Sequence, residues 1–236
     1  MAKLQIDVWS DIACPWCYVG KRRLEAALEG FPHRDEVAIT WHSFELDPSA
    51  SQEIDVEEVS YAQRLAEKYR VPEAGGQQMI DNMTETAAKD GIAMRFDVIR
   101  PGNTFDAHRL LHLAEERGKQ DALKERLLAA YLCEGERIGD HETLVRLAGE
   151  VGLDVDEAEG VLASQSYAAD VRSDESQAAQ LGIHGVPFFV FDRKYAVQGA
   201  QPAEIVRKVL DKAWEEAEPQ LVTLAEGAVC GPEGCD

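Results

Sequence analysis

Long hydrophobic runs are absent from the 236-residue sequence, and no apolar stretch approaches the roughly 20 residues that a membrane-spanning helix needs. The first residues, Met1 to Lys3, lead directly into an apolar stretch at 4–9, without the h-region and small-residue cleavage site of a secretory signal. We therefore expect no membrane partner and a cytoplasmic location. A mature secreted form, from which a signal has been removed, is the alternative.

Basic residues are scarce, with 24 Lys and Arg against 44 Asp and Glu and a formal net charge of −20. Nucleic acids and anionic membrane surfaces both bind cationic faces that displace their counterions. We therefore expect no nucleic-acid partner. The large negative charge is typical of a soluble surface and says little about the fold.

Cysteine is also rare, with five residues in the chain, yet Cys14 and Cys17 are separated by only two residues. A zinc site would need two further ligands, and the candidates with suitable spacing, Cys230 and Cys235, lie more than two hundred residues away. We favour a redox-active dithiol and predict no metal. Half of a zinc site and two unrelated core cysteines are the alternatives.

The dithiol stands where a predicted strand over residues 3–9 is followed by a predicted helix over 14–29. The first N–H groups of a helix carry partial positive charge, so we expect the pKa of Cys14 to fall below the free value of about 8.5. Cys17, one turn further, is expected to be more buried and to keep its proton. Cys14 would then attack a partner and Cys17 would resolve the mixed disulfide.

A second signal comes late in the chain, where Val186-Pro187 follows a Gly-containing approach and precedes the apolar run 188–191. In a thioredoxin-like fold a cis-proline loop lies against the dithiol, and only X–Pro bonds adopt the cis form readily. We predict that Pro187 is this cis-proline and that the Val186 backbone is open to pair with an incoming peptide. An ordinary strand-start proline is the alternative.

Hydrophobic periodicity predicts an α/β protein, a thioredoxin-like fold with a large inserted all-helical domain. The predicted domains are 1–49 and 181–216 for the two parts of the thioredoxin-like domain, 50–180 for the helical insertion and 217–236 for a C-terminal tail. The predicted strands cover residues 3–9, 36–46, 188–191 and 195–197. The predicted helices cover residues 14–29, 60–69, 77–83, 104–114, 122–132, 142–151, 156–163, 168–181 and 203–216.

The tail ends in Cys230-Gly-Pro-Glu-Gly-Cys235, where Gly and Pro allow a tight turn that brings the two cysteines together. We favour a second redox pair that exchanges electrons with the first. A tail with incidental cysteines and half of a metal site are the alternatives. The remaining cysteine, Cys133, is expected to be a small buried core residue.

Five motifs in this order resemble the FrnE-like branch of the DsbA family: CPWCYVG at 14–20, FELDP at 44–48, NTFDAHRL at 103–110, EGERIGD at 134–140 and GVPFF at 185–189. The resemblance covers roughly residues 3–215, and the tail pair is similar as well. It implies a thioredoxin fold interrupted by a helical domain, and thiol–disulfide oxidoreductase or isomerase activity on cysteine-containing protein clients. It also implies that Cys14 is the nucleophile, Cys17 the resolving thiol and Pro187 the cis-proline.

Periplasmic DsbA has His before its second cysteine, whereas this chain has Trp16, so we expect a couple less oxidising than the roughly −120 mV of DsbA. Trp16 either packs on a client or shields Cys17. In the family, the positions of Asn103 and His108 face the active-site cleft, which suggests contact with a substrate. The simpler interpretations are that Asn103 caps a helix and that His108 is a partly buried histidine with satisfied hydrogen bonds. The residues named as candidate substrate contacts are Pro15, Trp16, Val186, His184, Asn103 and His108.

No cofactor is predicted beyond the redox-active disulfide, with glutathione as a candidate co-substrate and a cellular thiol reductant or oxidant as a partner. One alternative is a glutathione-dependent isomerase of the 2-hydroxychromene-2-carboxylate type, which uses a serine, so that Cys17 argues against it. The other is a redox- or zinc-regulated protein that binds clients without turnover. Either a monomer or a homodimer is compatible with the sequence.

Overall fold

The computed structural model describes residues 3–51, 59–217, 230–231 and 234–235. A four-stranded sheet in the order β2-β1-β3-β4 forms its centre. β1 pairs in parallel with β2 and antiparallel with β3, and β3 pairs antiparallel with β4. The strands are β1 (Leu4–Ser10), β2 (Val37–Ser43), β3 (Phe188–Phe191) and β4 (Tyr195–Gln198).

The parallel pair is joined through helix α1 (Pro15–Leu28) and a short 3₁₀ turn, η1 (Arg34–Glu36), as a βαβ unit. Pro15 occupies the first turn of α1, where its missing N–H has no partner to lose. The strand predicted over 36–46 ends earlier, at Ser43, because its partner β1 ends at the paired Ser10.

A run of helices separates β2 from β3, which confirms the predicted thioredoxin-like fold with a helical insertion. The helix predicted over 77–83 is longer than expected, and the one predicted over 122–132 ends in a π-helical turn, η2 (Ala130–Glu134). The domain boundaries themselves stay predictions. The helices are α2 (Tyr61–Tyr69), α3 (Glu73–Lys89), α4 (Phe105–Glu116), α5 (Gln120–Ala129), α6 (His141–Glu150), α7 (Val155–Leu162) and α8 (Ala168–Gln180).

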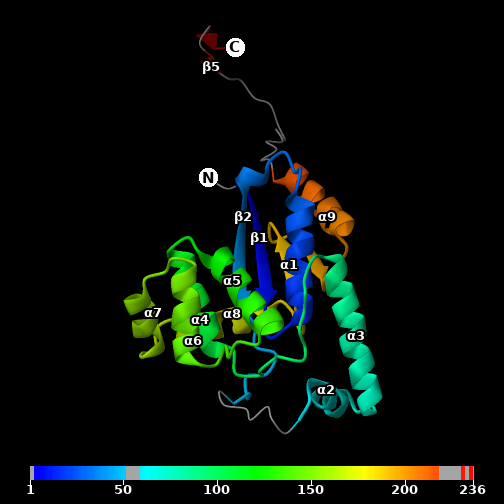
Figure 1. The fold of residues 1–236 in the computed structure, drawn as a ribbon. Coiled ribbons are helices and arrows are strands. Elements are labelled where there is room, and N and C mark those ends of the chain that lie inside the picture. Colours follow the sequence, from blue (N-terminus) through cyan, green and yellow to red (C-terminus); the bar gives the residue numbers. More distant parts are fainter. Residues whose placement is uncertain (1–2, 52–58, 218–229, 232–233, 236) are drawn as a thin grey trace.

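Two large hydrophobic cores share α1, with its first turn in one core and its last turns in the other. One lies between the sheet, α1 and α9 (Ala203–Glu216), and the other between the inserted helices. The second core includes Ile12, Tyr18 and Val19, which come from the β1–α1 region, so the insertion packs directly around the first turn of α1. Figure 1 shows α4 to α7 grouped on one side of β1. Helices α1 and α9 lie on the other side of this strand. None of the helices in the described ranges has the length and apolar character needed to cross a membrane.

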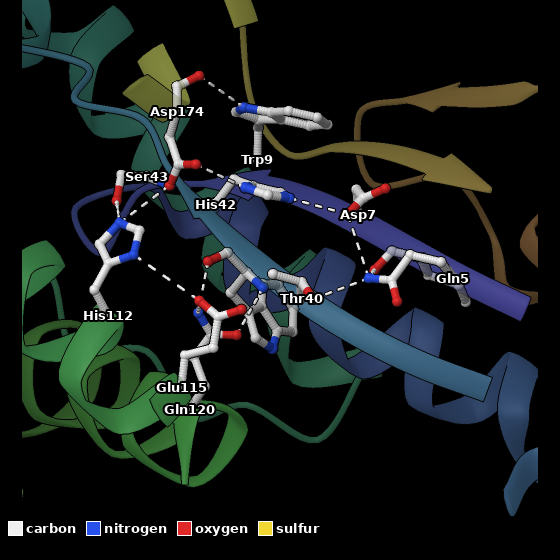
Figure 2. Close-up of polar contacts among 12 residues, drawn as sticks. Gln5, Asp7, Trp9, Thr40, His42, Ser43, His112, Glu115, Gln120 and Asp174 are labelled. Carbon is white, nitrogen blue, oxygen red and sulfur yellow. Dashed lines mark hydrogen bonds and ion pairs between the residues drawn. The ribbon is translucent and has the colours of Figure 1, made fainter. Parts of the chain in front are cut away.

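A polar network ties α8 to the β2 edge of the sheet (Figure 2). The Asp174 carboxylate binds the Ser43 N–H at 2.7 Å, His42 Nδ1 at 2.8 Å and His112 Nε2 at 3.2 Å. The other ring nitrogen of His42 lies 3.0 Å from Asp7 Oδ1. We call these residues the Asp174 network: Asp7, His42, Ser43, His112 and Asp174.

Near the C-terminus, two short strands, β5 (Cys230–Gly231) and β6 (Gly234–Cys235), pair antiparallel with Cys230 opposite Cys235. This register agrees with the tight turn that the sequence predicts. The rest of the predicted tail, 218–229, 232–233 and 236, lies outside the described residues.

Candidate active site

The four residues of the Cys14–Cys17 motif lie at the N-terminal end of α1, with Cys14 as the N-cap. Both cysteines are free thiols. Cys14 is 4% exposed and Cys17 is fully buried, whereas the Trp16 side chain between them is 46% exposed. Any reagent from solvent therefore meets Trp16 and the edge of Cys14 before it can reach Cys17.

The Val186–Pro187 peptide bond is cis, as predicted, and faces the dithiol. The Cys14 Sγ lies 3.6 Å from the Val186 carbonyl oxygen. Gly20 permits this close approach, since a Cβ there would lie 2.8 Å from Pro187 Cγ and 3.1 Å from Phe189 Cζ. The lack of a side chain at Gly20 thus lets α1 pack directly on the proline loop.

The pKa of Cys14 is well above its ordinary value, which corrects the expectation of a lowered pKa. The hydrogen bond and charge of Cys17 oppose ionisation, as do burial of the sulfur and the nearby Asp11 carboxylate. These effects outweigh the partial positive charge at the start of the helix. The reduced Cys14 therefore holds its proton near neutral pH.

A buried carboxylate–histidine pair lies beneath the dithiol. Asp11 Oδ1 is 3.3 Å from His108 Nε2, and Oδ2 accepts the Leu46 N–H at 2.8 Å. Burial favours neutral forms, but these contacts outweigh it and lower the pKa of Asp11, while burial lowers the pKa of His108. At neutral pH an ionised Asp11 thus accepts from a neutral His108, whose buried Nδ1 has no partner among the described residues.

Lys124 of α5 is the second buried charge at this site. Its side chain is fully buried and its Nζ donates to the Ser10 carbonyl oxygen at 3.3 Å. Burial lowers the pKa of Lys124 to about 8, while the charges of Cys17, Asp11 and Cys14 act in the opposite direction. A buried lysine with a lowered pKa therefore lies at the end of β1, which the loop to Cys14 follows.

The structure separates the remaining candidate contacts. His108 is fully buried, so the predicted contact with a substrate disagrees with its position against Asp11. Asn103 is half-buried and uses its side chain to bind the Ala50 carbonyl and the Phe105 N–H, at 3.2 Å and 2.8 Å. His184 is exposed. Pro15 and Val186 are half-buried at the dithiol, in the positions that their sequence context predicts.

A cleft opens between α2, α3 and residues 94–100. Tyr61 lines it, with its ring 5.2 Å from that of Phe96. Burial and the charge of Cys14 raise the pKa of Tyr61 to about 12. Neither the dithiol motif nor the proline loop contributes a residue to the lining of this cleft.

Sequence reasoning missed three residues of the site: Asp11, Gly20 and Lys124. Asp11 comes two residues after the predicted strand and three before Cys14, and Gly20 comes three residues after Cys17, so fixed spacing is the available signal. Lys124 lies in an ordinary helical segment with nothing in its neighbourhood to distinguish it. Its role depends on where α5 packs.

A dithiol at the start of a helix that follows β1, in contact with a cis-proline loop that precedes the neighbouring strand β3, defines a thioredoxin-fold protein with a redox-type active site. The model of the DSBA-like thioredoxin domain matches residues 5–211, so the chain belongs to the DsbA-like family.

Individual proteins agree with this assignment. A probable DsbA oxidoreductase from Streptomyces coelicolor is 46% identical, with a TM-score of 0.85 and coverage of 99% of this chain and 98% of that chain. The uncharacterized protein YwbO of Bacillus subtilis is 30% identical over 210 residues, 88% of this chain and 96% of that protein. The cytosolic disulfide reductase DsbM of Pseudomonas aeruginosa shares the fold at 17% identity and a TM-score of 0.59, covering 90% of this chain and 99% of that one.

Proposed function

We propose that this DsbA-like oxidoreductase exchanges disulfides with protein clients and also isomerises them, through Cys14 and Cys17. The observation that carries the proposal is the 3.6 Å approach of Cys14 Sγ to the Val186 carbonyl. An extended client that pairs with the Val186 backbone brings its own disulfide to Cys14. The exposed Trp16 offers an apolar contact at the same point.

The reaction proceeds in two exchanges. The Cys14 thiolate attacks one sulfur of the client disulfide, so that a mixed disulfide forms and the first client thiolate leaves. Cys17 then loses its proton and attacks Cys14 Sγ, which releases the second client thiolate and leaves a Cys14–Cys17 disulfide. The client gains two electrons and two protons. A cellular thiol, with glutathione as the candidate co-substrate, reduces the enzyme again, and isomerisation follows when the released client thiolate attacks elsewhere before Cys17 does.

Reduction of insulin and refolding of scrambled ribonuclease test this proposal. Cys14→Ser should abolish both activities, because the attacking sulfur is gone. Cys133→Ser is the matched control, since Cys133 is half-buried at the π-helical turn, and it should retain both. Equal activity of Cys14→Ser and the wild type would overturn the proposal.

We also propose that Cys230 and Cys235 form a second redox pair that exchanges with the dithiol. α9 runs alongside α1 in the same direction, because Arg23 binds the Ala200 carbonyl and Trp214 packs on Phe31. The tail therefore starts at the far end of α1, about 21 Å from the dithiol. The chain between 217 and 230 can span about 45 Å, which is sufficient.

Turnover of insulin by the double variant Cys230→Ser/Cys235→Ser tests this second role. If the tail pair exchanges electrons with the dithiol, the double variant should turn insulin over more slowly than the wild type. The reactivity of its Cys14 toward iodoacetamide should be unchanged. Turnover at the wild-type rate would remove the tail from the catalytic cycle.

We propose a cytoplasmic location and a couple less oxidising than that of periplasmic DsbA, in keeping with Trp16 in place of His. Titration against glutathione and dithiothreitol buffers gives the reduction potential. A value well above about −230 mV supports disulfide donation or isomerisation, and a value near −270 mV makes the protein a reductase.

A further inference from the structure

Asp11 is the first residue of the turn that leads from β1 to the dithiol. Its backbone carbonyl accepts the Cys14 N–H at 3.4 Å, and its side-chain oxygen Oδ1 accepts the Ala13 N–H at 3.4 Å. Aspartate is preferred at the first position of a turn because its side chain can bind the backbone two residues further on. The hydrogen bonds of a single turn therefore connect Asp11 to Cys14.

The Asp11 carboxylate also binds two segments that are distant in the sequence. Oδ2 accepts the Leu46 N–H at 2.8 Å, and Oδ1 lies 3.3 Å from His108 Nε2. Leu46 lies three residues beyond the end of β2, and His108 belongs to α4. One side chain thus joins the turn before the dithiol to the segment after β2 and to the inserted helices.

The requirements of a turn alone do not explain this aspartate. Loops usually lie at the surface, where water solvates their polar side chains, whereas Asp11 is 1% exposed. A buried carboxylate is costly unless it is paired and hydrogen-bonded. Over the described part of the chain, no Lys or Arg nitrogen lies within 4.0 Å of Asp11, so the N–H groups of Ala13, Leu46 and His108 are its partners.

The position of Cys14 depends on this turn from one side and on the proline loop from the other. Cys14 Sγ lies 3.6 Å from the Val186 carbonyl oxygen, and the Cys14 carbonyl accepts the Cys17 N–H at 3.0 Å as α1 begins. Ile12, inside the turn, is fully buried in the core of the inserted helices. Ile12 therefore anchors the turn by apolar packing, and Asp11 anchors it by hydrogen bonds.

We propose that Asp11 is a positioning residue of the dithiol, whose carboxylate holds the 11–14 turn against Leu46 and His108. This contact keeps Cys14 Sγ at the place where it meets a client disulfide beside Val186. Asp11 neither gives nor takes a proton in the exchange, and it forms no bond to the client. The inference rests on the dithiol chemistry proposed above but not on the identity of the client.

The negative charge of Asp11 does not explain its presence in the turn. Cys17 and burial are the main causes that raise the pKa of Cys14, and the charge of Asp11 adds to them. A residue that assisted the attack through its charge would favour the thiolate, whereas Asp11 opposes it. The positioning effect and the charge effect therefore have opposite signs, so that experiments can separate them.

Hydrogen exchange of backbone amides in the reduced full chain is the direct test, and it needs no client. Asp11→Ala should speed exchange of the Cys14 and Leu46 amides about tenfold or more, while amides inside α1 keep their wild-type rates. Asp11→Asn should stay within about threefold of wild type, because its amide oxygen can accept the Leu46 N–H and its NH2 group can donate to the other tautomer of His108. Wild-type exchange at both amides in Asp11→Ala would overturn the proposal.

The consequence for the reaction is tested with two reagents. Insulin reduction by Asp11→Ala should fall about tenfold or more, since a misplaced sulfur attacks poorly, and Asp11→Asn should restore it to within about threefold of wild type. Alkylation of Cys14 by iodoacetamide, followed by peptide mass mapping, should be at least as fast as in wild type for both variants, because both remove the negative charge. Asp154→Ala is the matched control, since Asp154 caps α7 by accepting the Glu157 N–H at 3.1 Å, and it should change neither rate.

The remaining outcomes separate positioning from other roles. A parallel loss of alkylation and insulin reduction in Asp11→Ala, or equal losses of insulin reduction in Asp11→Ala and Asp11→Asn, would contradict the proposal. If Asp11→Ala does not fold, His108→Leu removes one partner of the carboxylate and should slow insulin reduction about threefold with unchanged alkylation. Wild-type insulin reduction by folded His108→Leu would then overturn the proposal. A wild-type protein that does not reduce insulin, with faster amide exchange still seen in Asp11→Ala, would count against the protein client alone.

Discussion

The Asp174 network and the dithiol site are both buried and polar, but they treat their charges differently. In the Asp174 network the charged His42 lies between two carboxylates, at 2.8 Å and 3.0 Å, and Asp174 has further donors (Figure 2). In the dithiol site Lys124 has a single carbonyl partner at 3.3 Å. Ser10 Oγ and His108 Nδ1 are buried there without partners among the described residues.

The difference indicates what each region is for. Buried charges that are fully compensated hold elements together, whereas buried charges left short of partners respond to a change in a neighbouring group. The Asp174 network fixes α8 against β1 and β2, and its charges do not depend on the dithiol. Lys124 at the dithiol site, in contrast, has one carbonyl partner and no carboxylate in contact with it among the described residues.

Asp174→Asn should produce the largest effect on stability. It leaves His42 with one carboxylate instead of two, so we expect a loss of about 3 kcal/mol in the free energy of unfolding by urea at pH 7. Asp211→Asn is the control, because its 2.8 Å pair with Arg207 lies at the surface, and it should cost less than about 1 kcal/mol. Similar losses in both would remove the distinction between compensated and ordinary charges.

Gly20→Ala tests whether shape, rather than charge compensation, holds the dithiol site together. The added methyl group would lie 2.8 Å from Pro187 and must push α1 away, at a cost of about 2 kcal/mol and with slower insulin reduction. Gly160→Ala, in α7 with open space around it, should instead gain up to about 1 kcal/mol. If Gly20→Ala changed neither the stability nor the rate of insulin reduction, the packing of α1 on Pro187 would be loose.

The pH dependence of stability should follow His42. Burial lowers the pKa of His42, but the bonds to Asp174 and Asp7 outweigh this and raise it to about 9. The folded state therefore binds this proton more tightly than the unfolded state, whose pKa is about 6.5. The stabilisation is complete below pH 6.5 and is lost as pH rises to about 9, by about 2 kcal/mol.

His42→Gln isolates this contribution, because the other titrating groups are common to both proteins. The difference in unfolding free energy between wild type and His42→Gln should shrink from pH 6 to pH 9. A difference that stays constant over this range would mean that His42 is neutral in the fold.

Lys124→Met should have the smallest effect on stability, even though its side chain is as buried as any in the protein. Removing a charge without a carboxylate partner removes little, so the free energy of unfolding should stay level or rise by up to about 1 kcal/mol. Thermal and urea unfolding of the reduced protein measure it. A loss near that of Asp174→Asn would make Lys124 a structural group.

Most of the fold could be predicted from local signals. The apolar run before Cys14, the Val186-Pro187 pair and the helical periodicity between them are each visible within a short window, and the structure confirms the elements they predict. The predictions differ from the structure at the ends of helices and strands. β2 ends at Ser43 because its partner β1 ends at Ser10, and α5 is followed by a π-helical turn. Partners far away in sequence decide such limits.

The electrostatics of the site could not be predicted in the same way. Asp11, His108 and Lys124 come from a loop and two helices separated by about a hundred residues, and they meet only through tertiary packing. The position of Cys14 at a helix N-terminus, taken alone, favours a lowered pKa. Burial and the neighbouring Cys17 act in the opposite direction, and both are properties of the folded site.

The central claim, that Cys14 attacks disulfides and Cys17 resolves the product, is tested most directly by trapping. A Cys17→Ala variant incubated with a peptide disulfide should accumulate a mixed disulfide that peptide mass mapping places on Cys14, in about equimolar yield. Cys14→Ala, treated in the same way, should accumulate none. An adduct on another cysteine of the Cys17→Ala variant, or none at all, would contradict the account.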